Sequence, residues 1–201
     1  NYTFDTFAGG PPSGSNDGFG TEARFRRPFD VAVAPSGNLY VADYDNHLIR
    51  RITPDGVVST WAGQAGSRGY ANGVGAQARF DNPMAIAVDA GENVYVVDRS
   101  STIRRIAPDR TVSLFVGSPG QSGYVDGSGE TVRLSTTTGL AIDSQGNLYF
   151  PVTTSHTIRK VTPSGVVSTI AGEIGAAGYT DGSGSVARFR ADTGIQLRYL
   201  E

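Results

Sequence analysis

The chain is built from one repeat that runs along the whole sequence. Four short runs mark it: "TFAG" begins at residue 6, "TWAG" at 60, "LFVG" at 114 and "TIAG" at 169, so they are 54, 54 and 55 residues apart. An arginine at positions 24, 79, 133 and 188 recurs with nearly the same spacing. Repetition at a fixed period indicates an array of one supersecondary unit, which constrains the fold more than any single segment does.

Each unit holds four short apolar or alternating runs separated by residues typical of tight turns. In the first unit these runs are 29–34, 38–43, 47–52 and 57–62, with "PSGN" and "TPDG" among the turns. No helix-length stretch keeps a 3.6-residue apolar period, so the chain is predicted to be all-β. Four antiparallel strands per repeat predict a β-propeller with one four-stranded blade per unit.

Three blades are predicted to be complete, and terminal strands at 2–8 and at 193 to about 198 are assigned to incomplete blades. The units are about 2–56, 57–111, 112–166 and a truncated 167–201, within a single propeller region covering 1–201. Propellers generally need about four to eight blades to close. We therefore expect a partial propeller, completed by self-association or by a missing segment. A third possibility is that the terminal strands together form an irregular fourth blade.

The run "GNLYVADYDNHLIRRITPDG" at 37–56 resembles the NHL-repeat family and contains Asn46-His47-Leu48, the tripeptide that names it. The recurrent P-x-x-[IV]-A-[VI]-D, G-N-[LV]-Y-V and I-R-[RK]-[IV] patterns extend the resemblance over essentially the whole chain. The resemblance implies three complete NHL-type blades. It also implies an extracytoplasmic or secreted bacterial protein, because propellers resembling this one often occur in such multidomain proteins.

Composition narrows the functional classes. The 201 residues are 38% hydrophobic and 18% charged, which is typical of a folded protein with a sizeable core. The net charge of -2 makes an extended nucleic acid an unlikely partner, and no apolar run approaches the ~18 residues of a membrane span. There is no cysteine, so disulfides and thiolate metal sites are excluded. The start at Asn1 suggests a processed or excised product, and Leu200-Glu201 could be a cloning scar.

Binding is expected at the end of the propeller that carries the long loops. Alternating strand directions bring the long glycine-rich connectors and loops such as 43–47 and 98–101 to one end, and short turns to the other. Long loops on a rigid scaffold are the usual place for a binding site. The candidate binding residues on this face are Arg24, Arg26, Arg27, Tyr44, Asn46, His47, Tyr70, Arg99, Tyr124, His156 and Tyr179.

The repeated polar residues are interpreted as structural. The "DGxG" runs offer one carboxylate each, too few for calcium, so they are predicted to be turns. The repeated arginine is expected to tie neighbouring blades together through a carboxylate or carbonyl, and the aspartates to cap a strand, because functional positions usually break a repeat. These structural residues are Asp43 and Asp98, with Arg79, Arg133 and Arg188 as further copies of the Arg24 position. Val152 replaces the aspartate in the third blade.

Three functions remain open. The preferred one is a non-enzymatic binding or scaffold module that contacts a protein or glycan. A metal-dependent lyase or hydrolase at the channel mouth is the alternative, since some NHL-like propellers are lyases. His47 and His156 alone make no such site, however, and no catalytic or metal-ligating set is predicted. No cofactor is predicted, although calcium or zinc stays possible. Binding of single-stranded RNA at Arg24, Arg26 and Arg27 is the third possibility.

Overall fold

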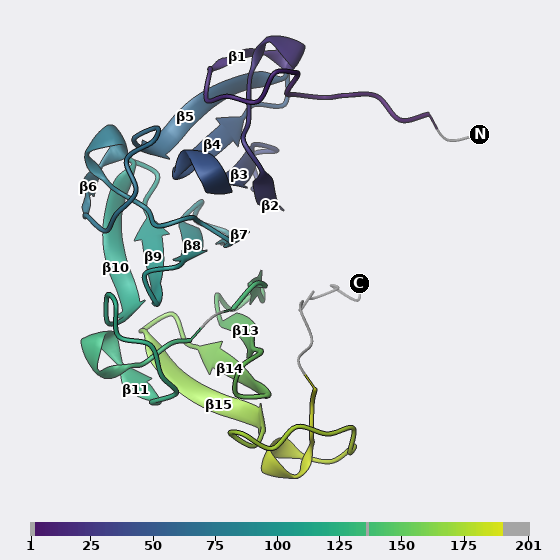
Figure 1. Cartoon of the computed structure of the whole chain (residues 1–201), viewed down its shortest axis with the longest axis vertical. Coiled ribbons are helices and arrows are strands. Elements are labelled where there is room, and N and C mark those ends of the chain that lie inside the picture. The colour runs from purple at the N-terminus through teal and green to yellow at the C-terminus, as the bar shows by residue number, and fades with distance from the viewer. Residues whose placement is uncertain (1–2, 136, 191–201) are drawn as a thin grey trace.

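The computed structural model describes residues 3–135 and 137–190, which form three antiparallel sheets arranged along an arc (Figure 1). Each sheet is one blade. The inner strands β2 and β7 lie toward the inside of the arc, and β5, β10 and β15 run along its outside (Figure 1). The all-β propeller class predicted from the repeat is therefore confirmed.

The bounds of the elements show how closely the blades repeat. Blade 1 has the order β1-β5-β4-β3-β2, and blades 2 and 3 have the equivalent orders β6-β10-β9-β8-β7 and β11-β15-β14-β13-β12. Blade 1 comprises β1 (Gly18–Phe19), β2 (Pro28–Val33), β3 (Leu39–Asp43), β4 (Leu48–Ile52) and β5 (Val57–Gly63). Blade 2 comprises β6 (Gly73–Val74), β7 (Ala85–Val88), β8 (Val94–Asp98), β9 (Thr102–Ile106) and β10 (Thr111–Gly117). Blade 3 comprises β11 (Gly127–Ser128), β12 (Ala141–Ile142), β13 (Leu148–Val152), β14 (Thr157–Val161) and β15 (Val166–Gly172).

Five short 3-10 helices complete the described part of the chain. They are η1 (Gly20–Glu22), η2 (Tyr44–Asn46), η3 (Gly75–Gln77), η4 (Gly129–Thr131) and η5 (Gly184–Val186). Apart from η2, each follows the glycine-rich run of a connector. Within residues 3–135 and 137–190, no helix has the length and apolarity needed to cross a membrane.

The blades have five strands instead of the predicted four. The additional strand is a two-residue segment of the preceding connector, which pairs with the outer strand; Gly18 and Phe19, for example, face Val58 and Val57. So short a segment among glycines has no alternation to reveal it. The expected strand at 2–8 is also wrong for its described part, because residues 3–8 form no strand, and the one at 193–198 lies outside the described residues.

Two apolar clusters join the blades. Between blades 1 and 2, Tyr40 and Ile49 contribute to the same buried cluster as Phe80 and Ile86. A second cluster joins blade 2 to blade 3 through residues such as Ile103 and Phe150. A polar contact adds to the first seam, since the Asp30 carboxylate accepts a hydrogen bond from the Ile86 backbone N–H at 2.9 Å. Burial raises the pKa of this carboxyl group.

The final glycine of the "TWAG" marker has a steric explanation. Gly63 ends β5 with a φ of +96°, and a Cβ atom there would lie 2.5 Å from the His47 carbonyl oxygen. Gly117 and Gly172 occupy the same position against Ser101 and His156. Only glycine combines this backbone conformation with so close an approach, so the marker recurs in every blade.

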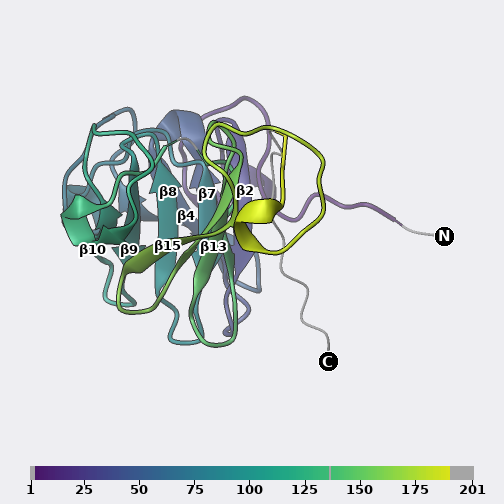
Figure 2. The same ribbon diagram turned by 90° about the horizontal axis from the view of Figure 1, so that it is seen from below.

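The connectors and the loops that join β3 to β4 and β8 to β9 meet on one of the two faces of the arc. Gly66 donates its backbone N–H to the Asn46 carbonyl, and Gly120 donates to the Ser100 carbonyl. Tight hairpins extend on the opposite face, at the bottom of Figure 2. The face with the connectors is called the long-loop face below, and the face with the hairpins the short-turn face.

Candidate functional site

A cluster of an exposed arginine, an exposed phenylalanine and a half-buried tyrosine lies on the long-loop face of blade 1. Phe29, at the start of β2, stacks on Tyr44 of η2 with ring centroids 5.4 Å apart and an interplanar angle of 27°. The Arg27 guanidinium lies 4.9 Å from the Tyr44 ring centroid and 6.0 Å from that of Phe29. Phe29 is 41% exposed. Arg27, Phe29 and Tyr44 are called the platform below.

The platform is specific to blade 1. In the repeat register, Arg27 corresponds to Asn82 and Phe29 to Met84, which is only 7% exposed. Tyr44 corresponds to Arg99 in blade 2. Positions that depart from a repeat are the ones expected to carry function, because the architecture itself needs the same residue in every blade.

The loop of blade 1 is fixed against blade 2 beside the platform. Asn82 donates its backbone N–H to His47 Nδ1 at 3.3 Å and its side-chain amide to the Tyr44 carbonyl at 3.1 Å. Because Nδ1 accepts, the neutral imidazole carries its proton on Nε2. Burial lowers the pKa of His47, which favours this neutral form. Next to this contact between the blades, Arg68 Nε lies 2.6 Å from Asp81 Oδ1 in an ion pair.

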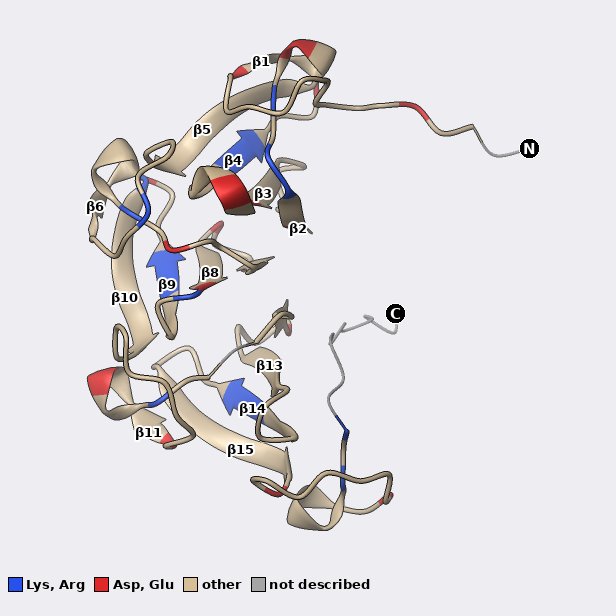
Figure 3. Ribbon diagram, in the orientation of Figure 1, with Lys and Arg blue, Asp and Glu red and all other residues tan. Residues whose placement is uncertain are grey.

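Sequence reasoning missed the buried arginines that anchor the connectors. Arg50, Arg104 and Arg159 lie on the central strands β4, β9 and β14, which Figure 3 shows in blue, and are almost completely buried. Arg104 donates to the carbonyls of Ala71 and Arg79 and to the side-chain oxygen of Asn72. Each anchor thus holds the connector that crosses the top of its own blade.

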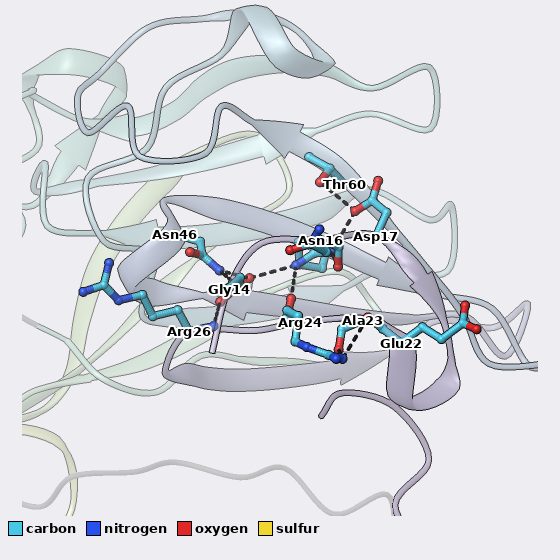
Figure 4. A network of polar contacts seen from close by, with 11 residues as sticks. Gly14, Asn16, Asp17, Glu22, Ala23, Arg24, Arg26, Asn46 and Thr60 are labelled. Atoms are coloured by element: carbon cyan, nitrogen blue, oxygen red, sulfur yellow. Dashed lines mark hydrogen bonds and ion pairs between the residues drawn. The ribbon is translucent and has the colours of Figure 1, made fainter. Parts of the chain in front are cut away.

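The repeated arginine of the connectors has a local role instead. Arg24 donates to the carbonyls of Thr21, Glu22 and Ala23, so it closes its own 3-10 turn. Figure 4 shows Arg24 beside Glu22 and Ala23. Arg133 and Arg188 bond the three equivalent carbonyls of their own connectors, and Arg79 bonds two of them, those of Ala76 and Ala78. The expectation that they bond a neighbouring blade is therefore wrong in its partner, because the 3-10 turn places unpaired carbonyls within three residues.

The "DGxG" carboxylates are partners of the anchors. Asp17 accepts from Arg50 at 2.7 Å and from the Thr60 hydroxyl at 3.0 Å, and Asp126 accepts from Arg159 at 2.6 Å. Figure 4 shows this network around Asp17. Across residues 3–135 and 137–190, no group of three His, Cys, Asp or Glu side chains is placed to hold a metal ion.

The two predicted capping aspartates are buried at the ends of their strands. Asp43 accepts from the Arg26 backbone N–H, the Asn46 amide and the Arg50 guanidinium. Asp98 accepts from the Ser100 backbone N–H and from that of Asp81. Burial raises the pKa of both carboxyl groups.

The remaining predicted binding residues do not gather at one place. Tyr70 lies over the Arg104 guanidinium at 4.3 Å, and Tyr124 packs against the cluster between blades 2 and 3. Arg26 and Arg99 are exposed on the long-loop face. His156 has the same left-handed backbone as His47, with a φ of +60°, but lies in blade 3. Tyr179 is 80% exposed in the last connector.

A cavity at the opposite end was not predicted. It has a volume of about 580 Å³ and lies among the short turns of all three blades. Val33, Val88 and Ile142, at the inner ends of the blades, form its apolar part, and the turn residues around Asp89 and Asp143 form its rim. Each turn contributes only a few residues and none forms a motif by itself. The cavity arises where the three blades meet, which is why the sequence did not reveal it.

Comparisons with known proteins give the same architecture. The NHL repeat model matches residues 25–52. NHL repeat-containing protein 2 of Gallus gallus is 48% identical over 56 residues, which cover 27% of this chain and 8% of that protein. The chain spans less than a tenth of the length of the curated relatives it matches.

Two groups of solved structures share the fold at low sequence identity. An auxiliary nutrient binding protein of Bacteroides ovatus is similar at a TM-score of 0.67 and 23% identity, over 87% of this chain and 44% of that one. Virginiamycin B lyase of Staphylococcus aureus is similar at a TM-score of 0.53 and 13% identity, over 75% of this chain and 43% of the lyase. The chain therefore contains an NHL repeat at residues 25–52 and shares the fold of these solved structures.

Proposed function

We propose that the chain is a non-enzymatic binding module that holds a glycan on its long-loop face, with the platform as the principal contact. The observation that carries the proposal is the stack of exposed Phe29 on half-buried Tyr44 under Arg27, which no other blade repeats. Aromatic faces and a fixed guanidinium are a suitable pair for sugars, since a ring face covers the apolar C–H side and the guanidinium donates to hydroxyl oxygens.

The local backbone supports preorganisation of this contact. Arg27 has a φ of +56°, a left-handed conformation that is uncommon for a residue with a side chain. Tyr44 is held from behind, because its carbonyl accepts from both Asn82 and the His47 backbone N–H. A rigid aromatic anchor loses little conformational entropy when a ligand binds, so affinity is gained.

The structural neighbours lend a second, weaker support. Two of them carry the description auxiliary nutrient binding protein, from Bacteroides thetaiotaomicron and Bacteroides ovatus. A nutrient-binding role for this chain would accord with an extracytoplasmic location, which we include in the proposal.

The test is a glycan array followed by titration calorimetry with the oligosaccharide that gives the strongest signal. We expect Phe29→Ala and Tyr44→Ala each to weaken binding at least tenfold, as is usual for an aromatic anchor. Phe19→Ala is the matched control, because Phe19 is 61% exposed but lies at the outer edge of the same blade.

The outcomes separate the possible partners. Loss of binding in both platform variants with the control unchanged would support the proposal. Binding that survives both substitutions would overturn the platform as the contact. If no glycan on the array bound, and a protein partner bound the unchanged chain but not Phe29→Ala, the face would bind protein instead of glycan.

A further inference from the structure

The last connector repeats the geometry that holds a buried arginine in every blade. In blade 1, Arg50 donates to the carbonyls of Asn16 and Arg24 and to the Asp17 carboxylate. In blade 3, Arg159 donates to the carbonyls of Val125 and Arg133 and to the Asp126 carboxylate. Together with Arg104, these give three copies of one acceptor set: two carbonyls and one side-chain oxygen at fixed places in the connector.

Residues 178–190 carry the fourth copy of that set. By repeat register its acceptors are the carbonyls of Thr180 and Arg188 and the carboxylate of Asp181. The backbone bonds that shape the other copies are present, since Gly178 donates to the Phe189 carbonyl at 3.0 Å and Arg188 donates to the Thr180 carbonyl at 2.9 Å. The corresponding bonds in the second connector are 3.1 Å from Gly69 to Phe80 and 3.1 Å from Arg79 to Ala71.

An open cavity lies at these acceptors. It has a volume of about 310 Å³, and its lining includes Tyr179, Thr180, Asp181, Arg188, Phe189 and Arg190. Within residues 3–135 and 137–190, no arginine donates a hydrogen bond to the Asp181 carboxylate. Within the described residues, the space that Arg50, Arg104 and Arg159 fill in the other copies thus holds no equivalent arginine.

The aromatic residues around the cavity are suited to a guanidinium, as are the oxygen acceptors. In blade 2, Arg104 lies between Tyr70 and Phe80, at 4.3 and 5.3 Å from the ring centroids. Tyr179 and Phe189 occupy the same two register positions around the fourth copy. A planar cation between two aromatic rings, with in-plane donors to three oxygens, is recognition specific to a guanidinium, because an ammonium cannot match that geometry.

We propose that residues 178–190 form a binding site for the guanidinium of an arginine on an extended peptide strand. The source is a strand because each of the three anchors lies on a central strand of its blade, in an I-R-[RK] run, and reaches the connector from that strand. The site is separate from the platform and does not depend on the glycan proposal.

The experiment uses the full chain, labelled with ¹⁵N, and two peptides. The first is HTIRKVTP, which is residues 156–163 of this chain and has one arginine; the second, HTIKKVTP, has lysine in its place. We expect the arginine peptide to shift the amide signals of residues 178–190 saturably, and the lysine peptide to bind at least tenfold more weakly. Asp181→Ala should weaken binding of the arginine peptide about tenfold or more, since it removes the side-chain acceptor and its charge-assisted bond.

Asp55→Ala is the control, because it removes a carboxylate from an exposed turn of blade 1. Equal binding of the two peptides, or an unchanged affinity in Asp181→Ala, would overturn the guanidinium site. Free methylguanidine that binds as tightly as the arginine peptide would overturn the strand as its source. Absence of any shift with either peptide or with methylguanidine would overturn the proposal altogether.

Discussion

At the scale of single residues, chemically similar side chains have different roles that depend on backbone position. Arg24 closes a 3-10 turn, Arg50 is buried under a connector, and Arg27 lies over the Phe29–Tyr44 pair. The repeat identifies recurring arginines, but it does not say which of two adjacent ones is buried. In "LIRRI", Arg50 points into the blade while Arg51 lies over Trp61 at 4.8 Å, and the sequence alone leaves them equivalent.

His47 gives a prediction about pH. Its folded-state pKa is lowered, so between the folded value and the ordinary value of about 6.5 the unfolded chain binds more protons. The free energy of unfolding should therefore fall as the pH is lowered through about 6.5, and should not change on this account at higher pH. The charged groups that act on His47 are Asp45, Asp81, Arg26 and Arg68.

His47→Asn tests this, since asparagine tolerates the left-handed backbone of this position. Urea unfolding at pH 7.5 and 5.5 should show a smaller loss of stability in the variant than in the unchanged protein. Ser101→Asn, at the equivalent left-handed position of blade 2, is the control that alters no titrating group. If His47→Asn and the unchanged protein lost stability equally, His47 would not be the responsible group.

At the scale of elements, the strands could be predicted and the connectors could not. The strands of 28–33, 39–43, 48–52 and 57–63 differ from their predicted ranges by a residue or two, because β-branched residues and turn signals determine them. Connectors consist of glycine and small polar residues, whose path depends on a buried arginine 25 or more residues away. The platform was missed as a unit for the same reason, since only the η2 turn brings Tyr44 onto Phe29.

The end of each outer strand gives a prediction about stability. A Cβ atom at Gly117 would lie 2.6 Å from the Ser101 carbonyl oxygen, with φ at +105°. We expect Gly117→Ala to lower the free energy of unfolding by about 3 kcal/mol, the sum of backbone strain and overpacking. Gly120→Ala is the matched control: its φ is +72°, nothing lies within 4 Å, and the strain alone predicts a loss of about 1 kcal/mol. Equal losses in urea unfolding would contradict the steric explanation.

At the scale of the whole molecule, residues 3–135 and 137–190 leave one face of blade 1 uncovered. Val31 and Val33 on β2 are 54% and 68% exposed, whereas the equivalent Ile86 and Val88 of blade 2 are 3% and 9% exposed because blade 1 packs on them. The repeat predicted the blades, but not what covers a terminal face, since that depends on a partner and not on the period. Adjacent exposed valines on an inner strand are typical of an interaction surface.

We propose that copies of this chain associate through the Val31–Val33 face. Sedimentation velocity at several concentrations should show reversible association, and Val31→Thr with Val33→Thr should shift it to higher concentration by removing apolar area. Val57→Thr, at an exposed position on the outer strand, is the control. A single monomeric species at every concentration would contradict self-association.

The central claim is that ligands bind at the long-loop face of blade 1 and not at the cavity among the short turns. Hydrogen–deuterium exchange with and without the oligosaccharide selected on the array measures both ends in one experiment. We predict that bound ligand slows exchange in residues 26–29 and 43–47 and leaves the turns at 34–38 and 89–93 unchanged. Protection confined to those short turns would contradict the claim and place the ligand in the cavity at the opposite end.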